Sequence, residues 1–252
     1  MLHTCTMNLA LLVMALTGQL KSADGTPSEV LSDWQIANDA GWRAFLRGDL
    51  TQAEERFKAA SEVVRPYQKG DPRLLARSYC DLAQVLMNQS RYDQAEPLAK
   101  WALKVRELHP RIQTETLYQN LYVLAQIHCG QGRLAEAEPL LRRALALQEK
   151  ALGPEHASLA ETLNDLAWVD SEVGRLTEAD ALYSRVLAIR TKTRPTNNLE
   201  IAETSEHYAV LLRRLDQLTK AQWLEARAKT IRSEAAAAIL AIPHDRTSDR
   251  KP

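Results

Sequence analysis

A short segment is repeated along this chain of 252 residues at a constant spacing. Its four clearest copies begin at Gly48, Ser90, Gly132 and Gly174, and a weaker copy begins at Asp216. The sixth residue of every copy is an alanine, so that alanines recur every 42 residues, at positions 53, 95, 137, 179 and 221. A period of this length indicates a fold that is built from stacked copies of one supersecondary unit.

Two further series of small residues share the same register. One consists of Gly41, Ala83, Ala125, Ala167 and Ala209, and the other of Ala60, Ala102, Ala144, Val186 and Ala228. Two helices approach closely only where the side chains at their crossing are small. Large apolar residues surround these positions at spacings of three, four and seven, which is the period of a helix. Each unit is therefore predicted to be a helix, a tight turn and a second helix.

Turn residues agree with this unit. Gly48, Gly132 and Gly174 lie between the two helices, where a left-handed backbone costs glycine least. We therefore predict an all-α solenoid of about five helix-turn-helix repeats. The expected units are residues 33–69, 70–111, 112–153, 154–195 and 196–232, and residues 233–252 are expected to extend the last helix and end in a disordered tail.

The N-terminal segment has the pattern of a signal peptide. Residues Leu9 to Leu16 form an apolar block that is too short to span a bilayer, and Val13 and Ala15 are small residues spaced for cleavage. We expect residues 1–23 to be a signal peptide, residues 24–32 to be a linker, and the protein to be exported to the periplasm or secreted. If the segment is not a signal, the alternative is a cytoplasmic protein with a disordered or helical N-terminal tail.

Charge and cysteine content exclude several classes of function. The 32 Lys and Arg residues balance 32 Asp and Glu residues, which disfavours nucleic acid as a partner. No run of 18 apolar residues occurs, so no membrane span is predicted. Cys5 lies in the expected signal peptide, which leaves Cys80 and Cys129, and these are expected to be free thiols in helices.

Motifs for catalysis or cofactor binding fail on their context. The segment Gly130 to Ala135 matches the glycine pattern of dinucleotide sites, but a helix is predicted before it where a strand is required. The histidines lack the spacing of metal ligands. Glu54, Glu96, Glu138 and Asp180 recur with the period and are interpreted as acids in the first turn of a helix. We predict no catalytic residue, no metal and no cofactor.

The spacing of small and aromatic residues resembles that of the tetratricopeptide repeat. The 42-residue period, the sequence Ala-Glu-Pro-Leu at 95–98 and 137–140, and the stretches 144–156 and 162–167 resemble the kinesin light chain subtype. The resemblance covers about residues 33–232 and weakens at the ends, where Glu225 replaces the expected aromatic residue. It implies a right-handed superhelix with a concave peptide-binding groove and no catalytic activity.

The resemblance also implies which residues line the groove, because the first helix of each unit would face it. The expected partner-binding residues are Asn38, Trp42, Phe45, Arg77, Gln84, Tyr122, Gln126, Asn164, Trp168 and Arg213. The four aromatic residues among them are expected to lie away from the core and to anchor the partner. Chaperone-binding members of the family grip a carboxylate with Lys and Asn on this stripe. Since the stripe carries no lysine here, a mixed polar and aromatic peptide or helix fits better.

Two functions remain open from the sequence. The favoured one is a protein-interaction scaffold whose groove binds a peptide or helix of a partner protein. The alternative is a structural role, in which solenoids self-associate through their end caps or outer helices.

Overall fold

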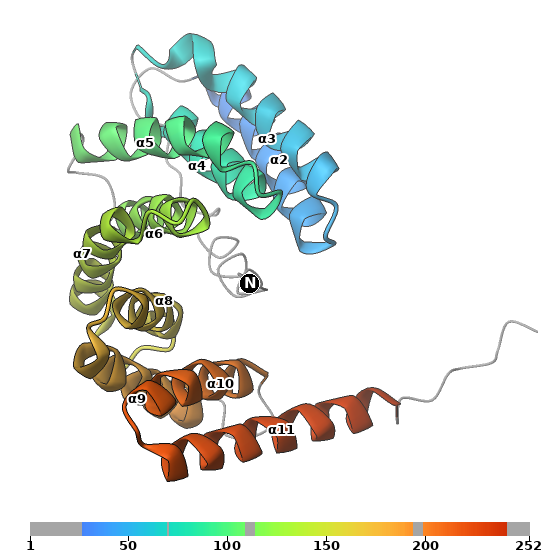
Figure 1. The fold of residues 1–252 in the computed structure, drawn as a ribbon. Helices are drawn as coiled ribbons and strands as arrows, with labels where there is room; N and C mark the ends of the chain where they lie inside the picture. The colour runs from blue at the N-terminus through green and yellow to red at the C-terminus, as the bar shows by residue number, and fades with distance from the viewer. Residues whose placement is uncertain (1–26, 70, 109–113, 194–198, 241–252) are drawn as a thin grey trace, which may run out of the picture. The chain divides into compact units, whose positions relative to one another are not determined.

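Helices make up nearly all of the described protein (Figure 1). The computed structural model describes residues 27–69, 71–108, 114–193 and 199–240. Within these ranges the chain forms ten α-helices, one short 3-10 helix and no strand, which confirms the predicted all-α class. The helices are α2 (Ser28–Leu46), α3 (Leu50–Val64), α4 (Arg73–Asn88), α5 (Tyr92–Leu108), α6 (Thr114–Gly130), α7 (Leu134–Leu152), α8 (Leu159–Glu172), α9 (Leu176–Thr193), α10 (Leu199–Arg214) and α11 (Leu218–Leu240), and the 3-10 helix is η2 (Arg65–Tyr67).

Consecutive helices pack in pairs, and we number these helical hairpins one to five, from α2–α3 to α10–α11. The predicted register of helix, tight turn and helix is therefore confirmed. Hairpin one begins at Ser28, so that five residues of the expected linker are helical. The expected signal peptide, its cleavage sites and the end of the C-terminal tail lie outside the described residues. No helix in the described part of the chain is both long and apolar enough to cross a membrane.

The five turns have one backbone structure. The residue at the same place in each turn has a positive φ, as in Gly48 (77°) and Gly132 (75°), and Ser90 (59°) and Asp216 (56°) adopt it without being glycine. The next residue donates its amide proton to a carbonyl five positions earlier, for example Arg133 N to His128 O at 2.8 Å. This pattern closes the C-terminus of the first helix with a left-handed residue and reverses the chain. The repeated segment of the sequence is thus this turn and the helix that follows it.

Small residues lie at the crossings of the helices, as predicted. The alanines of the repeated segment, at positions 53, 95, 137, 179 and 221, are all fully buried. At Gly41 a Cβ atom would lie only 2.6 Å from Cε1 of Phe57, so α2 and α3 cross in direct contact there. Close packing of this kind holds each hairpin together without large side chains at its centre.

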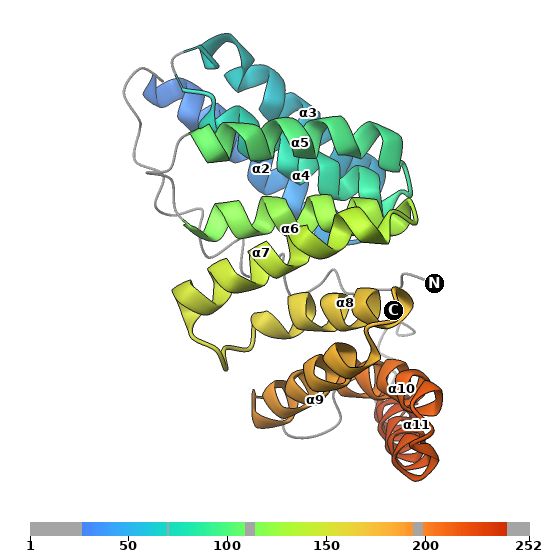
Figure 2. The same cartoon turned by 60° about the vertical axis from the view of Figure 1, so that its left-hand side comes forward.

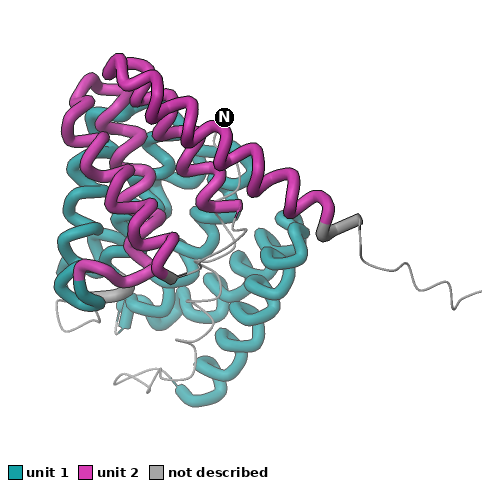
Figure 3. The backbone as a smooth tube through the Cα atoms, turned by 90° about the horizontal axis from the view of Figure 1, so that it is seen from below, with its two compact units in different colours: residues 1–153 teal, residues 154–252 magenta. Residues whose placement is uncertain are grey.

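The chain divides into two compact units, residues 1–153 and 154–252 (Figure 3). Unit 1 contains hairpins one to three, and α4 lies beside α6 within it (Figure 2). Its core includes Trp42, Phe57 and Leu121. Unit 2 contains hairpins four and five, and its core is centred on Tyr183 and Tyr208, whose rings stack 5.5 Å apart. The division falls at the boundary that was expected between the third and fourth repeats.

Candidate functional site

The first helices of the hairpins carry all of the predicted binding residues, and side-chain contacts join neighbouring first helices within each unit. In unit 1, Trp34 Nε1 of α2 donates a hydrogen bond to Ser78 Oγ of α4 at 2.8 Å. One turn further on, Asn38 Nδ2 donates to Asp81 Oδ2, also at 2.8 Å. In unit 2, Thr204 Oγ1 of α10 lies 3.3 Å from Asn164 Oδ1 of α8 and donates to it. Two of the predicted residues, Asn38 and Asn164, therefore help to hold successive hairpins together.

The expectation that aromatic residues of the stripe lie away from the core is wrong for three of the four. Trp42 is only 1% exposed and meets Phe45 and Phe57 edge to face at 5.4 and 5.3 Å. Phe45 is 7% exposed and Tyr122 is 3% exposed. Trp42 is buried because it follows Gly41, where α3 approaches α2 closely enough for Phe57 to reach the indole ring.

The fourth aromatic residue, Trp168, is half-buried and packs against the core of unit 2. Among the predicted polar residues, Asn38, Gln84 and Asn164 are buried, and Gln126 is half-buried and donates to Tyr122 Oη at 2.8 Å. The predicted residues are thus mainly interior, and a partner reaches few of them directly.

A buried polar cluster in unit 1 includes two residues that the stripe does not contain. Asp81 accepts a hydrogen bond from Asn38, and Arg77 Nε lies 3.8 Å from the same carboxylate. Burial raises the pKa of Asp81 above its usual range, although Arg77 and Asn38 act in the opposite direction. Arg106 of α5 lies close enough to influence this carboxylate. Asp39, Asp81 and Asp165 share one position of the repeat, and this periodic acid is the signal that would have found Asp81.

The corresponding region of unit 2 is acidic. Burial raises the pKa of Glu161 to about 8, and the nearby carboxylates of Asp165, Glu200 and Glu203 act in the same direction. Arg190 of α9 opposes this shift. This region thus contains several acids in unit 2, whereas the corresponding region of unit 1 contains Arg77 and Arg106 beside Asp81.

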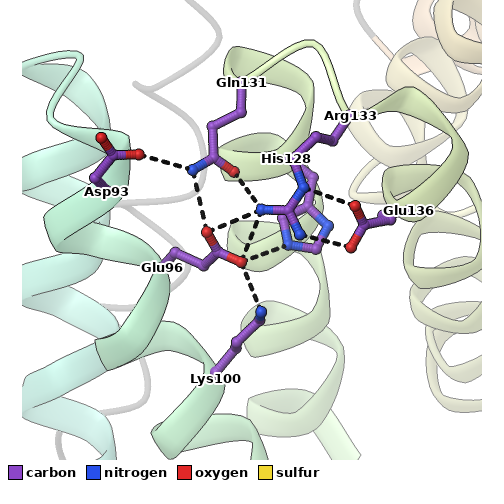
Figure 4. A network of polar contacts seen from close by, with 7 residues as sticks. All are labelled: Asp93, Glu96, Lys100, His128, Gln131, Arg133 and Glu136. Atoms are coloured by element: carbon purple, nitrogen blue, oxygen red, sulfur yellow. Dashed lines mark hydrogen bonds and ion pairs between the residues drawn. The ribbon is translucent and has the colours of Figure 1, made fainter.

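The periodic acids Glu54 and Glu96 have a role that the sequence did not reveal. Glu96 of α5 accepts hydrogen bonds from Arg133 Nη1 at 2.9 Å and from Gln131 at 3.1 Å, both in the next hairpin, and pairs with Lys100 at 2.6 Å (Figure 4). The hydrogen bond from Lys100 and those from Arg133 and Gln131 lower the pKa of Glu96 to about 2.

The same arrangement occurs one period earlier. There Arg91 Nη1 donates to Glu54 at 2.6 Å, and Lys58 pairs with the other carboxylate oxygen. These acids are therefore links between hairpins and not only first-turn acids that favour the helix dipole.

His128 also belongs to the network around Glu96. It is almost fully buried, and its Nε2 lies 3.4 Å from Glu96 Oε1 (Figure 4). Burial and then the charge of Arg133 lower the pKa of His128, in spite of Glu96 and Glu136. This environment therefore favours the neutral form of the imidazole.

Hairpin four contacts hairpin five through one of its faces, and the equivalent face of hairpin five carries charges. Hairpin four uses Asn164, Ser171 and Tyr183 there, which contact Thr204, Arg214 and Tyr208. One period later these positions are Glu206, Arg213 and Glu225. Arg213 donates to both carboxylate oxygens of Glu225 at 2.9 and 2.8 Å, and Arg232 does the same to Glu206 at 2.7 Å each. The predicted binding residue Arg213 is thus engaged within its own hairpin.

Over the described ranges the chain contains no group of three or more His, Cys, Asp or Glu residues that could hold a metal ion. Cys80 and Cys129 are free and buried thiols, and burial raises the pKa of Cys80 to about 12.

Known proteins resemble this chain in sequence and in fold. A family model described as tetratricopeptide repeat matches residues 43–107 and 117–192. Nearly identical TPR-like repeats of a kinesin light chain-like protein from Podosopora anserina share 22% identity with a TM-score of 0.65, over 84% of this chain and 98% of that one.

Two further solved structures have the same fold. BtubC (BKLC) from P. vanneervenii gives 20% identity and a TM-score of 0.67, over 90% of this chain and 98% of that one. YrrB, a TPR protein with an unusual peptide-binding site, gives 18% and 0.53, over 81% and 89%. No curated protein sequence matches the chain.

Proposed function

Because the chain belongs to the tetratricopeptide repeat family, we propose that it is a protein-interaction scaffold whose first helices bind a segment of a partner protein. The family's fold is generally a scaffold without catalysis, and the chain acts by binding in this proposal. The apolar block Leu9 to Leu16 supports a location outside the cytoplasm.

The mixed character of the first helices supports this proposal most directly. Gln126 and Trp168 are half-buried, and Val210, one period after Trp168, is 61% exposed. A peptide offers both amide protons and apolar side chains to such a surface. The occupant we favour is therefore a peptide or helix with polar and apolar residues.

Self-assembly through the end of hairpin five is less well supported. The two bidentate ion pairs, Arg213 with Glu225 and Arg232 with Glu206, place four charges in hairpin five, three of them at positions where hairpin four has the neutral residues Asn164, Ser171 and Tyr183. Desolvating these pairs in a stacked assembly would cost free energy.

Site-specific photocrosslinking tests the proposed surface. A benzoylphenylalanine placed at Gln126 or Val210 should crosslink a defined partner from the source cells. The same residue at Ala146 or Ala181, which are exposed on second helices, is the matched control. Equal crosslinking from both sets, or crosslinks only between copies of the chain, would contradict the proposed surface.

A further inference from the structure

We propose that unit 1 contains an oxyanion site built around Arg106, near the end of α5, that takes a carboxylate or phosphate group. This inference goes beyond the proposed function, because it concerns the binding of an anion and does not depend on a partner protein.

Arg106 is a buried cation with an unused donor. Arg106 is 7% exposed, and its Nε atom has no hydrogen-bond partner among the described residues. Burial lowers its pKa to about 10, and the charges of Arg77 and Arg73 act in the same direction. Asp81 opposes the shift, but its carboxylate is already in contact with Asn38 and Arg77. The cluster therefore has more positive than negative charge, and burying an uncompensated charge costs free energy.

The equivalent arginine in unit 2 shows what this position requires. Arg190, two periods after Arg106, donates from Nη1 to Thr204 Oγ1 and to the carbonyl oxygen of Glu200 at 2.7 Å. Its Nε lies 3.8 Å from the Glu200 carboxylate, and it interacts electrostatically with Glu161. The Nη1 atom of Arg190 thus has two acceptors, and the acids Glu200 and Glu161 lie nearby.

Unit 1 places donors and a cation at the same positions. Asn120 corresponds to Thr204, Gln119 to Glu203 and Arg77 to Glu161. The Nδ2 atom of Asn120 and the Nε2 atom of Gln119 are buried and have no acceptor in the part of the chain that the structure describes. Among the described residues, the unused groups of Arg106, Asn120 and Gln119 are donors, and the one unused acceptor of the cluster, Oδ1 of Asn38, belongs to an uncharged amide. An oxyanion accepts several charge-assisted hydrogen bonds at once. The missing component is therefore a group with acceptor oxygens and negative charge.

Arginine side chains lie at increasing depth from the surface of α4 toward Arg106. The side chain of Arg73 is 40% exposed and pairs with Asp71, whereas that of Arg77 is 11% exposed and that of Arg106 lies deeper. The positive charge thus continues from the surface of α4 to Arg106, which attracts an anion inward.

The experiment uses the full chain and free anions as probes. Thermal unfolding is followed in chloride, phosphate, sulfate and acetate at equal ionic strength. We expect phosphate or acetate to raise the melting temperature of the wild type in a saturable manner, because a ligand that binds only the folded state stabilises it. A rise with phosphate and sulfate alone identifies a phosphate-type ligand, and a rise with acetate identifies a carboxylate. No rise with any of them would overturn the proposal.

Two variants separate binding from a structural role. Arg106→Gln copies hairpin three, where the buried residue Gln148 occupies this position. In chloride it should melt at or above the wild type, and it should lose the rise with anions. Gln119→Glu, which copies Glu203, supplies a carboxylate internally, so it should raise the melting temperature in chloride and lose the rise as well.

The matched control is Arg232→Gln, at the same position of hairpin five, where the arginine forms an exposed ion pair with Glu206. This variant should keep the response to anions. If Arg106→Gln keeps that response too, or melts lower in chloride without losing it, Arg106 is a structural residue and the proposal is overturned.

Discussion

The guanidinium of Arg133 donates hydrogen bonds of 2.9 Å to both carboxylate oxygens of Glu96, a residue 37 positions earlier in the chain. This pair joins the turn of hairpin three to the second helix of hairpin two. Arg91 and Glu54 are separated by the same 37 positions and form the same link between hairpins one and two. The period of the sequence therefore sets contacts between repeats as well as the structure within each one.

Replacing Glu96 with Gln should destabilise unit 1, because the amide keeps the shape but not the charge that Arg133 and Lys100 require. Loss of such hydrogen bonds to a charged group commonly costs about 1–3 kcal/mol. Chemical denaturation measures the change. Glu136→Gln removes the other, more exposed partner of Arg133 and should have a smaller effect. An equal loss from both variants would show that Glu96 is not the centre of the link.

The buried His128 should make stability depend on pH. Its pKa is lower in the folded chain than in the unfolded one, where it is about 6.5, so the unfolded state binds the proton first. The contribution to stability is complete above that value and is lost as the pH falls through the folded-state pKa. Denaturation curves between neutral and mildly acidic pH measure it. In His128→Leu, which copies Leu86 one period earlier, the dependence in this range should decrease; an unchanged profile would exclude His128 as its source.

Larger residues at the helix crossings should destabilise their hairpins. Ala137→Leu and Ala167→Leu each force a side chain into a position without exposure, and overpacking of this kind costs about 1–3 kcal/mol. The damage should extend to the neighbouring hairpins, because repeats stabilise one another. Ala146→Leu and Ala181→Leu, at exposed positions, are the controls. Melting temperatures like that of the wild type would contradict the close crossings.

Trp42 should behave as a core residue and not as a binding anchor. Trp42→Ala removes the indole between Phe45 and Phe57 and should cost about 3–5 kcal/mol, as is usual for a buried aromatic residue. Val210→Ala, at an exposed position of α10, should leave the melting temperature nearly unchanged and weaken capture of the crosslinked partner. A stable Trp42→Ala variant that has lost its partner would restore the aromatic groove that the sequence suggested.

If the protein is exported, its signal peptide is removed and the mature chain is shorter than the full sequence. Because the apolar block Leu9 to Leu16 is followed by small and polar residues, the mature protein should begin between Leu16 and Asp24. Amino-terminal sequencing of the protein from its native source tests this. An intact Met1 would remove the proposed location outside the cytoplasm.

The sequence by itself determined the helices, the turns and the small residues at the crossings. These features depend on residues within one repeat, such as Gly132 in its turn and Ala137 in the helix that follows, and repetition makes them visible as a period. Charge pairs such as Arg133 with Glu96 were also present in the sequence as periodic residues. Their contact became evident only when successive hairpins were placed side by side.

The tertiary structure decided which residues of the stripe are buried and which charges have partners. Trp42 and Val210 occupy the same position of the repeat, yet one is in the core and the other is 61% exposed. Arg106 and Arg190 also share a position, yet Arg190 donates to the carbonyl oxygen of Glu200, whereas Arg106 lies close to the charges of Arg77 and Asp81. The physical reason is that periodicity fixes the direction of a side chain from its own helix. Burial and pairing depend on the side chains that the neighbouring hairpin presents, and these differ from one repeat to the next.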